Sequence, residues 1–196
     1  MGQLSEELRY VERGSLLCAA FVTYLGGVSE RQRKDVVKQL KQILRQSDFD
    51  PIGFIASQTE QLNWKNDGLP AGKIPFYKQQ FYLIPDELSV QNGVVLFNDS
   101  STPLVIDPTG RVPAFLQKHV DKAELLKAAQ NDLITQIEFG LRFGKTIIVD
   151  DVIEVDPTLV PILRKDLTSI GPRQVIFSKE NHFDNAKPRT GERNIK

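Results

Sequence analysis

The sequence predicts an α/β fold, in which strands alternate with helices. Two short apolar runs, PLVI at Pro103–Ile106 and TIIV at Thr146–Val149, indicate buried strands, because strands covered on both faces are continuously apolar. A turn-rich loop follows the first run, two carboxylates follow the second, and amphipathic helical stretches surround both. The resulting order of strand, loop, helix, long helix, strand, helix and strand is typical of the α/β class.

Composition limits the class of protein. The chain of 196 residues is long enough for one domain with its own core, and 40% apolar with 26% charged residues indicates a globular protein. Its 25 basic and 25 acidic residues balance, so charge favours neither nucleic acid nor an anionic membrane as a partner. The single cysteine, Cys18, allows no internal disulfide and fits a reducing compartment.

The first part of the chain is predicted to be helical. Met1–Arg13 has apolar residues spaced by four and three, as at the end of a helix, and Ser15–Leu25 forms a strongly apolar helix. Ser29 is a predicted N-cap for a helix over Glu30–Arg45, whose opposite face is basic. That face is either a surface for an acidic partner or a solvated helix face. The expected inward residues are Leu16, Leu17, Ala20, Phe21, Tyr24 and Leu25 in one helix, and Val36, Val37, Leu40, Ile43 and Leu44 in the next.

Three segments connect these helices to the first strand. Phe54–Trp64 is predicted as a short helical or extended piece, with Trp64 as a packing anchor. Ala71–Leu83 combines aromatic residues with lysines, and we predict an insertion packed on the core. Base stacking is the alternative, which the balanced charge does not favour. Pro85–Asn98 is predicted as a short helix that stops near Asn92-Gly93, followed by an apolar strand.

The second half alternates helices and strands. Ala123–Phe143 is predicted as one long amphipathic helix, ended by Gly144. An Asp-Pro pair at 156–157 opens another helix, with Asp156 as its cap and proline at the first helical position. Gln174–Phe177 is the last predicted strand, and the polar segment from Ser178 onward is expected to be frayed or disordered. The expected buried positions are Leu125, Leu126, Ala129, Leu133, Ile137 and Leu141, then Leu159, Val160, Ile162 and Leu163.

The loop after the first apolar run resembles a phosphate-binding loop in position but not in residues. On the pattern G-x-x-x-x-G-K-[ST], Gly110 is the second glycine, Val105 replaces the first, and Arg111 and Val112 replace the lysine and the hydroxyl residue. That motif points backbone N–H groups at phosphate and a hydroxyl at magnesium. Pro108 removes one N–H, and Val112 offers no oxygen. We therefore predict a pocket that does not hydrolyse nucleotide.

Asp150 and Asp151 end the second apolar run, and two interpretations are open. They form either a Walker-B-like pair, with one acid on a metal and one on water, or a pair that caps the strand end. Nucleotide hydrolases of this type carry a glutamate second, and Asp151 is one methylene shorter. The failed loop favours the cap. His119 and His182 are too isolated in sequence to form a metal set.

Six blocks in order along the chain carry a family resemblance: LLCAAFVTYLGG (Leu16–Gly27), EQLNWKNDGLP (Glu60–Pro70), PDELSVQNG (Pro85–Gly93), PLVIDPTG (Pro103–Gly110), RFGKTIIVDDV (Arg142–Val152) and DPTLVPILRKDLTSIGPR (Asp156–Arg173). Together they resemble the dynein heavy chains, in the region of the fifth AAA module just after the stalk coiled coil. The AAFVTYLG and GPR blocks resemble the cytoplasmic heavy chains, including the intraflagellar-transport type, more than the axonemal ones.

The resemblance implies a P-loop-type AAA+ large subdomain of three layers, preceded by stalk-end and linking helices. Residues 1–13 would end a stalk-type helix, 14–100 would be the helical N-terminal part with an insertion at 71–83, and 101–178 the degenerate core, followed by a polar tail at 179–196. The family continues into a further central strand and a helical lid, and the match fades after Arg173. We therefore expect an incomplete subdomain, whose strands at Pro103–Ile106 and Thr146–Val149 lack a neighbour between them and leave edges prone to aggregation.

The expected function is that of a non-hydrolysing structural module in an ATP-driven microtubule motor, relaying change between ring and stalk. The resemblance implies no catalytic residue, cofactor or metal in this module, with ATP and magnesium bound by other modules. Its partners would be neighbouring AAA+ modules, dynein subunits and, through the stalk, microtubules, in the cytoplasm, cytoskeleton or cilium. Two alternatives remain open: a live ATPase using Arg111, Asp150 and Asp151, and a scaffold that binds partners through residues 30–45.

Overall fold

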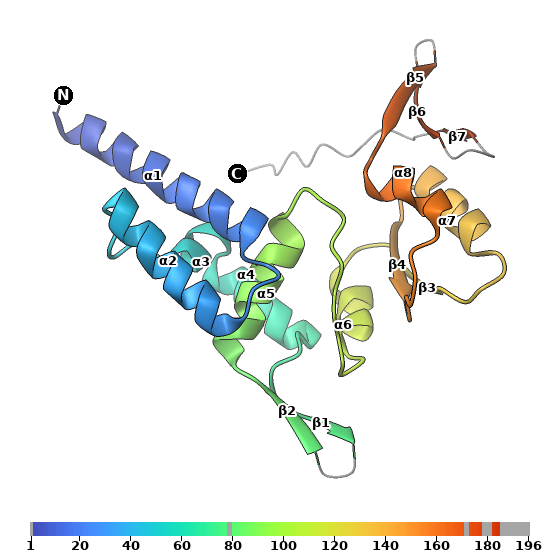
Figure 1. Cartoon of the computed structure of the whole chain (residues 1–196), viewed down its shortest axis with the longest axis horizontal. Coiled ribbons are helices and arrows are strands. Elements are labelled where there is room, and N and C mark those ends of the chain that lie inside the picture. The colour runs from blue at the N-terminus through green and yellow to red at the C-terminus, as the bar shows by residue number, and fades with distance from the viewer. Residues whose placement is uncertain (1, 78–79, 171–172, 178–181, 185–196) are drawn as a thin grey trace. The chain divides into compact units, whose positions relative to one another are not determined.

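A computed structural model describes residues 2–77, 80–170, 173–177 and 182–184 (Figure 1). The chain divides into two compact units, Met1–Val112 and Pro113–Lys196. The first unit contains α1 Gly2–Tyr24, α2 Glu30–Leu44, α3 Pro51–Ile55, α4 Gln58–Asp67, β1 Gly72–Tyr77, β2 Gln80–Ile84 and α5 Asp86–Asn98. Helix α6, Val112–His119, begins at the boundary. The second unit continues with β3 Ala123–Lys127, α7 Leu133–Arg142, β4 Thr146–Asp150, the 3-10 turn η1 Pro157–Leu159, α8 Val160–Leu163, β5 Leu167–Ile170, β6 Arg173–Phe177 and β7 His182–Asp184.

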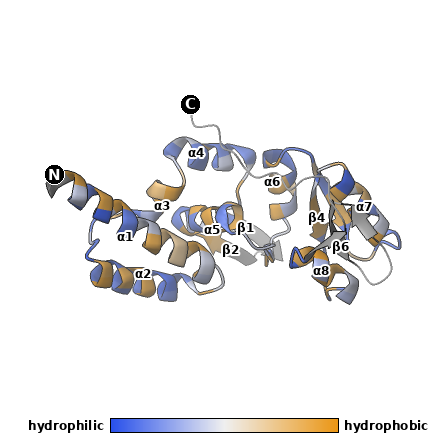
Figure 2. Cartoon of the chain, turned by 90° about the horizontal axis from the view of Figure 1, so that it is seen from above, coloured by the Kyte–Doolittle hydropathy of each residue, from blue (hydrophilic) through white to orange (hydrophobic). Residues whose placement is uncertain are grey.

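Helix α1 is the centre of the first unit and packs against α2, α3 and α5. It runs unbroken through Gly14, so the two predicted helical segments form one helix. The ring of Phe49 lies so close to Gly14 that a Cβ there would overlap it, and glycine is therefore required by packing. Figure 2 shows hydrophobic and hydrophilic residues alternating along α1 and α2. The buried hydrophobic residues of this unit are Leu17, Cys18, Phe21, Leu25, Phe49, Ala56, Trp64, Val90 and Val94.

Helix α2 confirms its predicted start. Ser29 accepts a hydrogen bond from the Gln32 N–H, and the Gln32 side chain accepts one from the Ser29 N–H, which forms a capping box. Several predicted inward residues are wrong, however: Leu16, Tyr24 and Ile43 are 59%, 75% and 75% exposed.

Between α2 and the boundary, three predictions change. Phe54–Trp64 belongs to two separate helices, α3 and α4. Helix α5 continues through Gly93, so the strand predicted after Gly93 is wrong. The glycine leaves room for the Trp64 indole, whose nearest atom lies 3.1 Å from where a Cβ would stand. Trp64 is buried, which confirms it as a packing residue. Within Ala71–Leu83, strands β1 and β2 pair as an antiparallel hairpin, whose ribbon projects from the helices of its unit in Figure 1.

The second unit contains a parallel β–α–β unit, which confirms the α/β class. Strands β3 and β4 pair in parallel from Ala123 opposite Thr146 to Lys127 opposite Asp150, and α7 packs on both. Gly140 of α7 faces Ile147 so closely that a Cβ would overlap its side chain. The predicted strand at Thr146–Val149 is confirmed. The long helix predicted over Ala123–Phe143 is wrong, because its first five residues form β3 and only Leu133–Arg142 is helical, as α7.

The segment Pro103–Ile106 is not a strand. Leu104 and Ile106 are 80% and 88% exposed, so this apolar run is extended without a ladder. The partner that β4 finds is β3. The prediction that Pro103–Ile106 and Thr146–Val149 flank a missing neighbour is therefore wrong for the first of the two strands.

The end of the described chain is partly as predicted. Asp156 caps the turn before α8, accepting from the Thr158 N–H at 2.8 Å. Val160 and Leu163, predicted as buried, are 37% and 36% exposed. Strands β5, β6 and β7 form an antiparallel sheet, so β6 confirms the strand over Gln174–Phe177, while β7 follows it. The calls at 171–172, 178–181 and 185–196 lie outside the described residues.

Within the described part of the chain, no helix combines the length and the apolar character that crossing a membrane requires.

Candidate functional site

The loop predicted as a degenerate phosphate site is a tight turn held by its own aspartate. The Asp107 carboxylate accepts hydrogen bonds from the Thr109 N–H at 2.9 Å, the Thr109 hydroxyl at 2.5 Å and the Val112 N–H at 2.7 Å. Gly110 adopts φ +66°, which glycine supports without strain. The turn delivers the chain directly into α6.

The protonation of Asp107 reflects these contacts. Burial acts to raise the pKa of the carboxyl, but the hydrogen bonds from the Thr109 side chain and from the backbone of Val112, Thr109 and Arg111 outweigh it and hold the pKa below its ordinary value. Asp107 is therefore a carboxylate at neutral pH. It places a fixed negative charge at the start of α6, where a helix favours an anion.

These residues do not fit a bound nucleotide. In a phosphate-binding loop the backbone N–H groups and one hydroxyl are directed at phosphate and magnesium. Here the N–H groups of Thr109 and Val112 and the Thr109 hydroxyl are directed at Asp107. Pro108 has no N–H, and Val112 supplies no oxygen. An anion bound at this turn would have to displace the Asp107 carboxylate.

The acid pair at the end of β4 is bridged by a lysine. Lys127, at the end of β3, donates from Nζ to Asp150 Oδ2 and to Asp151 Oδ2, both at 2.7 Å. The parallel register causes this meeting, because it sets Lys127 opposite Asp150. Asp151 adopts φ +57°, and its N–H donates to Asp150 Oδ1 at 2.9 Å.

The charges of this cluster stabilise one another. The hydrogen bond from Lys127 lowers the pKa of Asp150, and the hydrogen bonds to Asp150 and Asp151 raise the pKa of Lys127. The ammonium group thus lies between the two carboxylates and neutralises the pair. Among the described residues, no group of three or more His, Cys, Asp or Glu side chains is arranged to hold a metal ion. His119 stacks on Phe115, with ring centroids 5.6 Å apart.

Sequence reasoning named the right segments but missed two residues that decide their chemistry. Val105, Pro108, Gly110, Arg111 and Val112 were compared with the phosphate-loop pattern, whereas Asp107 organises the turn. Its signal was present, since an Asp followed two residues later by a hydroxyl residue is typical of an Asx turn. The other residue is Lys127, the partner of Asp150 and Asp151. It lies in the stretch predicted as a helix, so the strand register that sets it opposite Asp150 could not be predicted.

Comparison with known proteins decides the family. The sequence model of the ATP-binding dynein motor region matches residues 77–187, more than half of the chain. The chain belongs to this family. The predicted dynein resemblance is thereby confirmed, and with it the AAA+ character of the α/β fold.

The chain is also similar to individual dynein heavy chains. It is 50% identical over 172 residues to cytoplasmic dynein 2 heavy chain 1 of Caenorhabditis elegans, covering 87% of this chain. The corresponding protein of Chlamydomonas reinhardtii is 38% identical over 181 residues, and that of Homo sapiens 32% over 176 residues, covering 90% and 89% of the chain. The chain spans 4% of the length of each of these relatives.

Proposed function

We propose that this dynein motor-region chain is a structural AAA+ module that neither binds nor hydrolyses ATP. The observation that carries the proposal is the Asp107 carboxylate, which takes up the N–H groups at the start of α6. The salt bridges from Lys127 to Asp150 and Asp151, the pair compared with a Walker-B motif, also support the proposal. The family is described as ATP-binding, and the proposal is that this member has lost that property.

Its role in the motor would be to relay conformational change between neighbouring modules and the stalk. Helix α1 supports this role because it is a single helix of 23 residues whose last turns are fixed in the core of the first unit. Arg33 donates to the carbonyls of Leu25 and Gly26 just beyond α1. A displacement of α1 would therefore be passed to α2 and, through the other contacts of Arg33, to α5.

The activity of the whole protein follows by similarity to the cytoplasmic dynein 2 heavy chains. We infer a microtubule motor that hydrolyses ATP in other modules, acting with neighbouring AAA+ modules, further dynein subunits and microtubules. Its location would be the cytoplasm and cytoskeleton, including the cilium. In this chain no cofactor and no metal would be bound.

A melting experiment tests the loss of nucleotide binding. The 196-residue chain is heated with magnesium alone and with magnesium and ATP. Binding to the folded state would add about 2.7 kcal/mol at a hundredfold excess over the dissociation constant, so a site would raise the melting temperature. We expect the two curves to coincide. A clear rise with ATP would overturn the proposal in favour of a divergent but functional site.

A second experiment separates a cap from a catalytic acid. Asp151→Asn, placed in a full-length heavy chain that contains this module, should leave the motor ATPase nearly unchanged. The Asp151 side chain is 72% exposed, and within the part of the chain that the structure describes Asp151 bonds to Lys127 and to Asp150 at its own strand end. A tenfold or greater loss of rate, about 1.4 kcal/mol in the activation barrier, would show that the acid pair is catalytic.

A further inference from the structure

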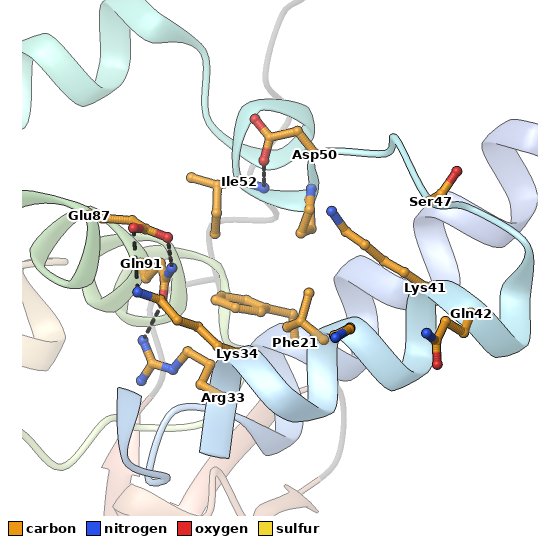
Figure 3. Close-up of a pocket in the computed structure, with 13 residues that line it drawn as sticks. Phe21, Arg33, Lys34, Lys41, Gln42, Ser47, Asp50, Ile52, Glu87 and Gln91 are labelled. Carbon is orange, nitrogen blue, oxygen red and sulfur yellow. Dashed lines mark hydrogen bonds and ion pairs between the residues drawn. The ribbon is translucent and has the colours of Figure 1, made fainter. Parts of the chain in front are cut away.

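The first unit has a charged cavity that the nucleotide question does not involve. It measures about 470 Å³, which lies within the range of ligand sites, and it is bounded by α1, α2, α3 and α5 (Figure 3). Its apolar wall consists of Phe21, Val37, Pro51 and Ile52. Its polar rim comes mainly from α2 and includes Lys34, Lys38 and Lys41.

Most charged groups around the cavity are already paired. Arg33 is 2% exposed and donates to four neutral oxygens. Glu87 contacts Lys34 at 3.7 Å and accepts from Gln91. Asp50 accepts from the N–H groups of Ile52 and Gly53. These carboxylates are thus committed to the protein itself.

Lys38 and Lys41 are different. Neither lysine side chain has an ion pair or hydrogen bond among the residues that the structure describes, although both line the cavity. In Figure 3 the Lys41 side chain extends from α2 toward α3, across the cavity. The cavity therefore has two positive charges that no described carboxylate neutralises.

The spacing of the lysines selects the shape of the ligand. Lys34, Lys38 and Lys41 are separated by four and three residues on one helix, so they form a single row. The row is about 10 Å long at the helical rise. A compact anion such as phosphate contacts one end of such a row, whereas acidic side chains on a peptide segment reach all of it. The apolar wall beside the row suits an aliphatic side chain from the same segment.

We propose that this α2 cavity docks an acidic segment of a partner protein, with an aliphatic residue against Val37 and Ile52 and carboxylates along Lys34, Lys38 and Lys41. Charge complementarity carries the inference, because Lys38 and Lys41 are the unneutralised groups and the neighbouring acids are engaged. The basic face of α2, predicted as either a partner surface or a solvated face, thereby acquires a defined ligand class.

The test uses a fluorescent amphipathic peptide with three glutamates one helical turn apart and a leucine between them. Its binding to the 196-residue chain is followed by fluorescence anisotropy. We expect saturable binding that weakens at least about tenfold in Lys38→Glu/Lys41→Glu, and by a similar factor when the peptide glutamates are glutamines. Absence of saturation up to about 1 mM peptide, equivalent to −4.1 kcal/mol, overturns the proposal.

Three controls make the result specific. Arg9→Glu/Arg13→Glu changes the net charge equally on exposed positions of α1 that do not line the cavity, and it should leave binding within about threefold, since distant exposed charges are screened at physiological salt. An equal loss in this variant would mean non-specific attraction, and would overturn the proposal. If the charge-reversal variant fails to fold, Lys38→Ala/Lys41→Ala replaces it in the test, because alanine removes both charges and is a good helix former. Displacement of the peptide by equimolar inorganic pyrophosphate would assign the cavity to a compact anion instead.

Discussion

The junction around Arg33 and the strand end around Lys127 each place one cation at the meeting point of several elements, but in opposite surroundings. Arg33 is 2% exposed, and its hydrogen-bond acceptors among the described residues are neutral, the carbonyls of Leu25 and Gly26 and the side-chain oxygens of Gln91 and Asn92. The Lys127 side chain is 51% exposed and touches two carboxylates. Counting salt bridges would rank Lys127 as the more important residue.

The physical chemistry reverses that ranking. An exposed ion pair gains little because water already solvates both charges and salt screens them. A buried guanidinium has lost its water, which lowers the pKa of Arg33, an effect that Glu30 opposes. Two of its oxygen partners, the Leu25 carbonyl and the Gln91 side-chain oxygen, also lie in buried hydrogen bonds, so removing the arginine leaves them without donors. Burial, rather than the number of opposite charges, decides which contact holds the fold.

The largest effect is therefore expected from Arg33→Met. The substitution fills similar space but removes the donors from four oxygens, and we expect the free energy of unfolding to fall by about 3 kcal/mol. Chemical denaturation followed by far-UV circular dichroism measures it. The matched control is Lys34→Met, one residue away and about half exposed, where we expect little change. Equal effects of the two substitutions would contradict the ranking by burial.

An intermediate effect is expected at the half-buried Asp107. Asp107→Ala removes the acceptor for the Thr109 and Val112 N–H groups at the start of α6. Loss of such a cap costs about 1 kcal/mol. The measurement is again denaturation, with Asp48→Ala as a control at an exposed turn. A loss as large as that of Arg33→Met would show that the turn matters more than its burial suggests.

The dependence of stability on pH tests whether the charge of Asp107 is responsible for its effect. Because the pKa of Asp107 is lowered in the folded chain, the ionised carboxylate contributes fully to the stability of the fold above the ordinary aspartate pKa of about 3.9. This contribution is lost as the pH falls through the lower folded value. The difference in stability between the parent chain and Asp107→Ala should be constant from about pH 8 to pH 5 and shrink below about pH 4. A difference that persists unchanged in acid would mean that the charge of Asp107 is not involved.

The smallest effect is expected from Lys127→Ala. Its two ion pairs are exposed, so the unfolding midpoint should move by no more than the error of the measurement. Any residual change should vanish in about 1 M salt, where the Debye length is about 3 Å. A loss of stability comparable with that of Asp107→Ala, and still present at high salt, would show that the contacts of Lys127 with Asp150 and Asp151 stabilise the fold.

What the sequence predicted well was local chemistry. The caps at Ser29 and Asp156 and the stop at Gly144 depend on residues within a few positions of one another, and the structure confirms them. The predicted helical segments Met1–Arg13 and Ser15–Leu25 meet at Gly14, and the predicted helix from Pro85 stops near Asn92-Gly93, because glycine is a poor helix former. Both glycines are inside helices, since distant rings, Phe49 and Trp64, occupy the space that a side chain would take.

The harder errors concern pairing over distance. Ala123–Lys127 has an apolar pattern that suits a helix as well as a short strand, and only its parallel register with β4 distinguishes them. The basic face of Glu30–Arg45 is predicted as a partner surface or a solvated face, and both predictions place its charges on the surface, whereas Arg33 is 2% exposed. The carbonyls of Leu25 and Gly26 that hold it are eight and seven residues away, and Gln91 and Asn92 lie much further along the chain, so periodicity within α2 carried no signal for them.

Any external anion must compete with the Asp107 carboxylate for the N–H groups of the turn. A carboxylate joined to its N–H partners by two to five residues of chain is present at a high local concentration that dilution cannot lower, on the order of millimolar or above for short tethers. A free phosphate would have to exceed that tethered competitor before it gained access to the same donors. Replacing Arg111 by lysine or Val112 by threonine would therefore leave the turn occupied, and recovering an anion site would begin with the removal of one aspartate.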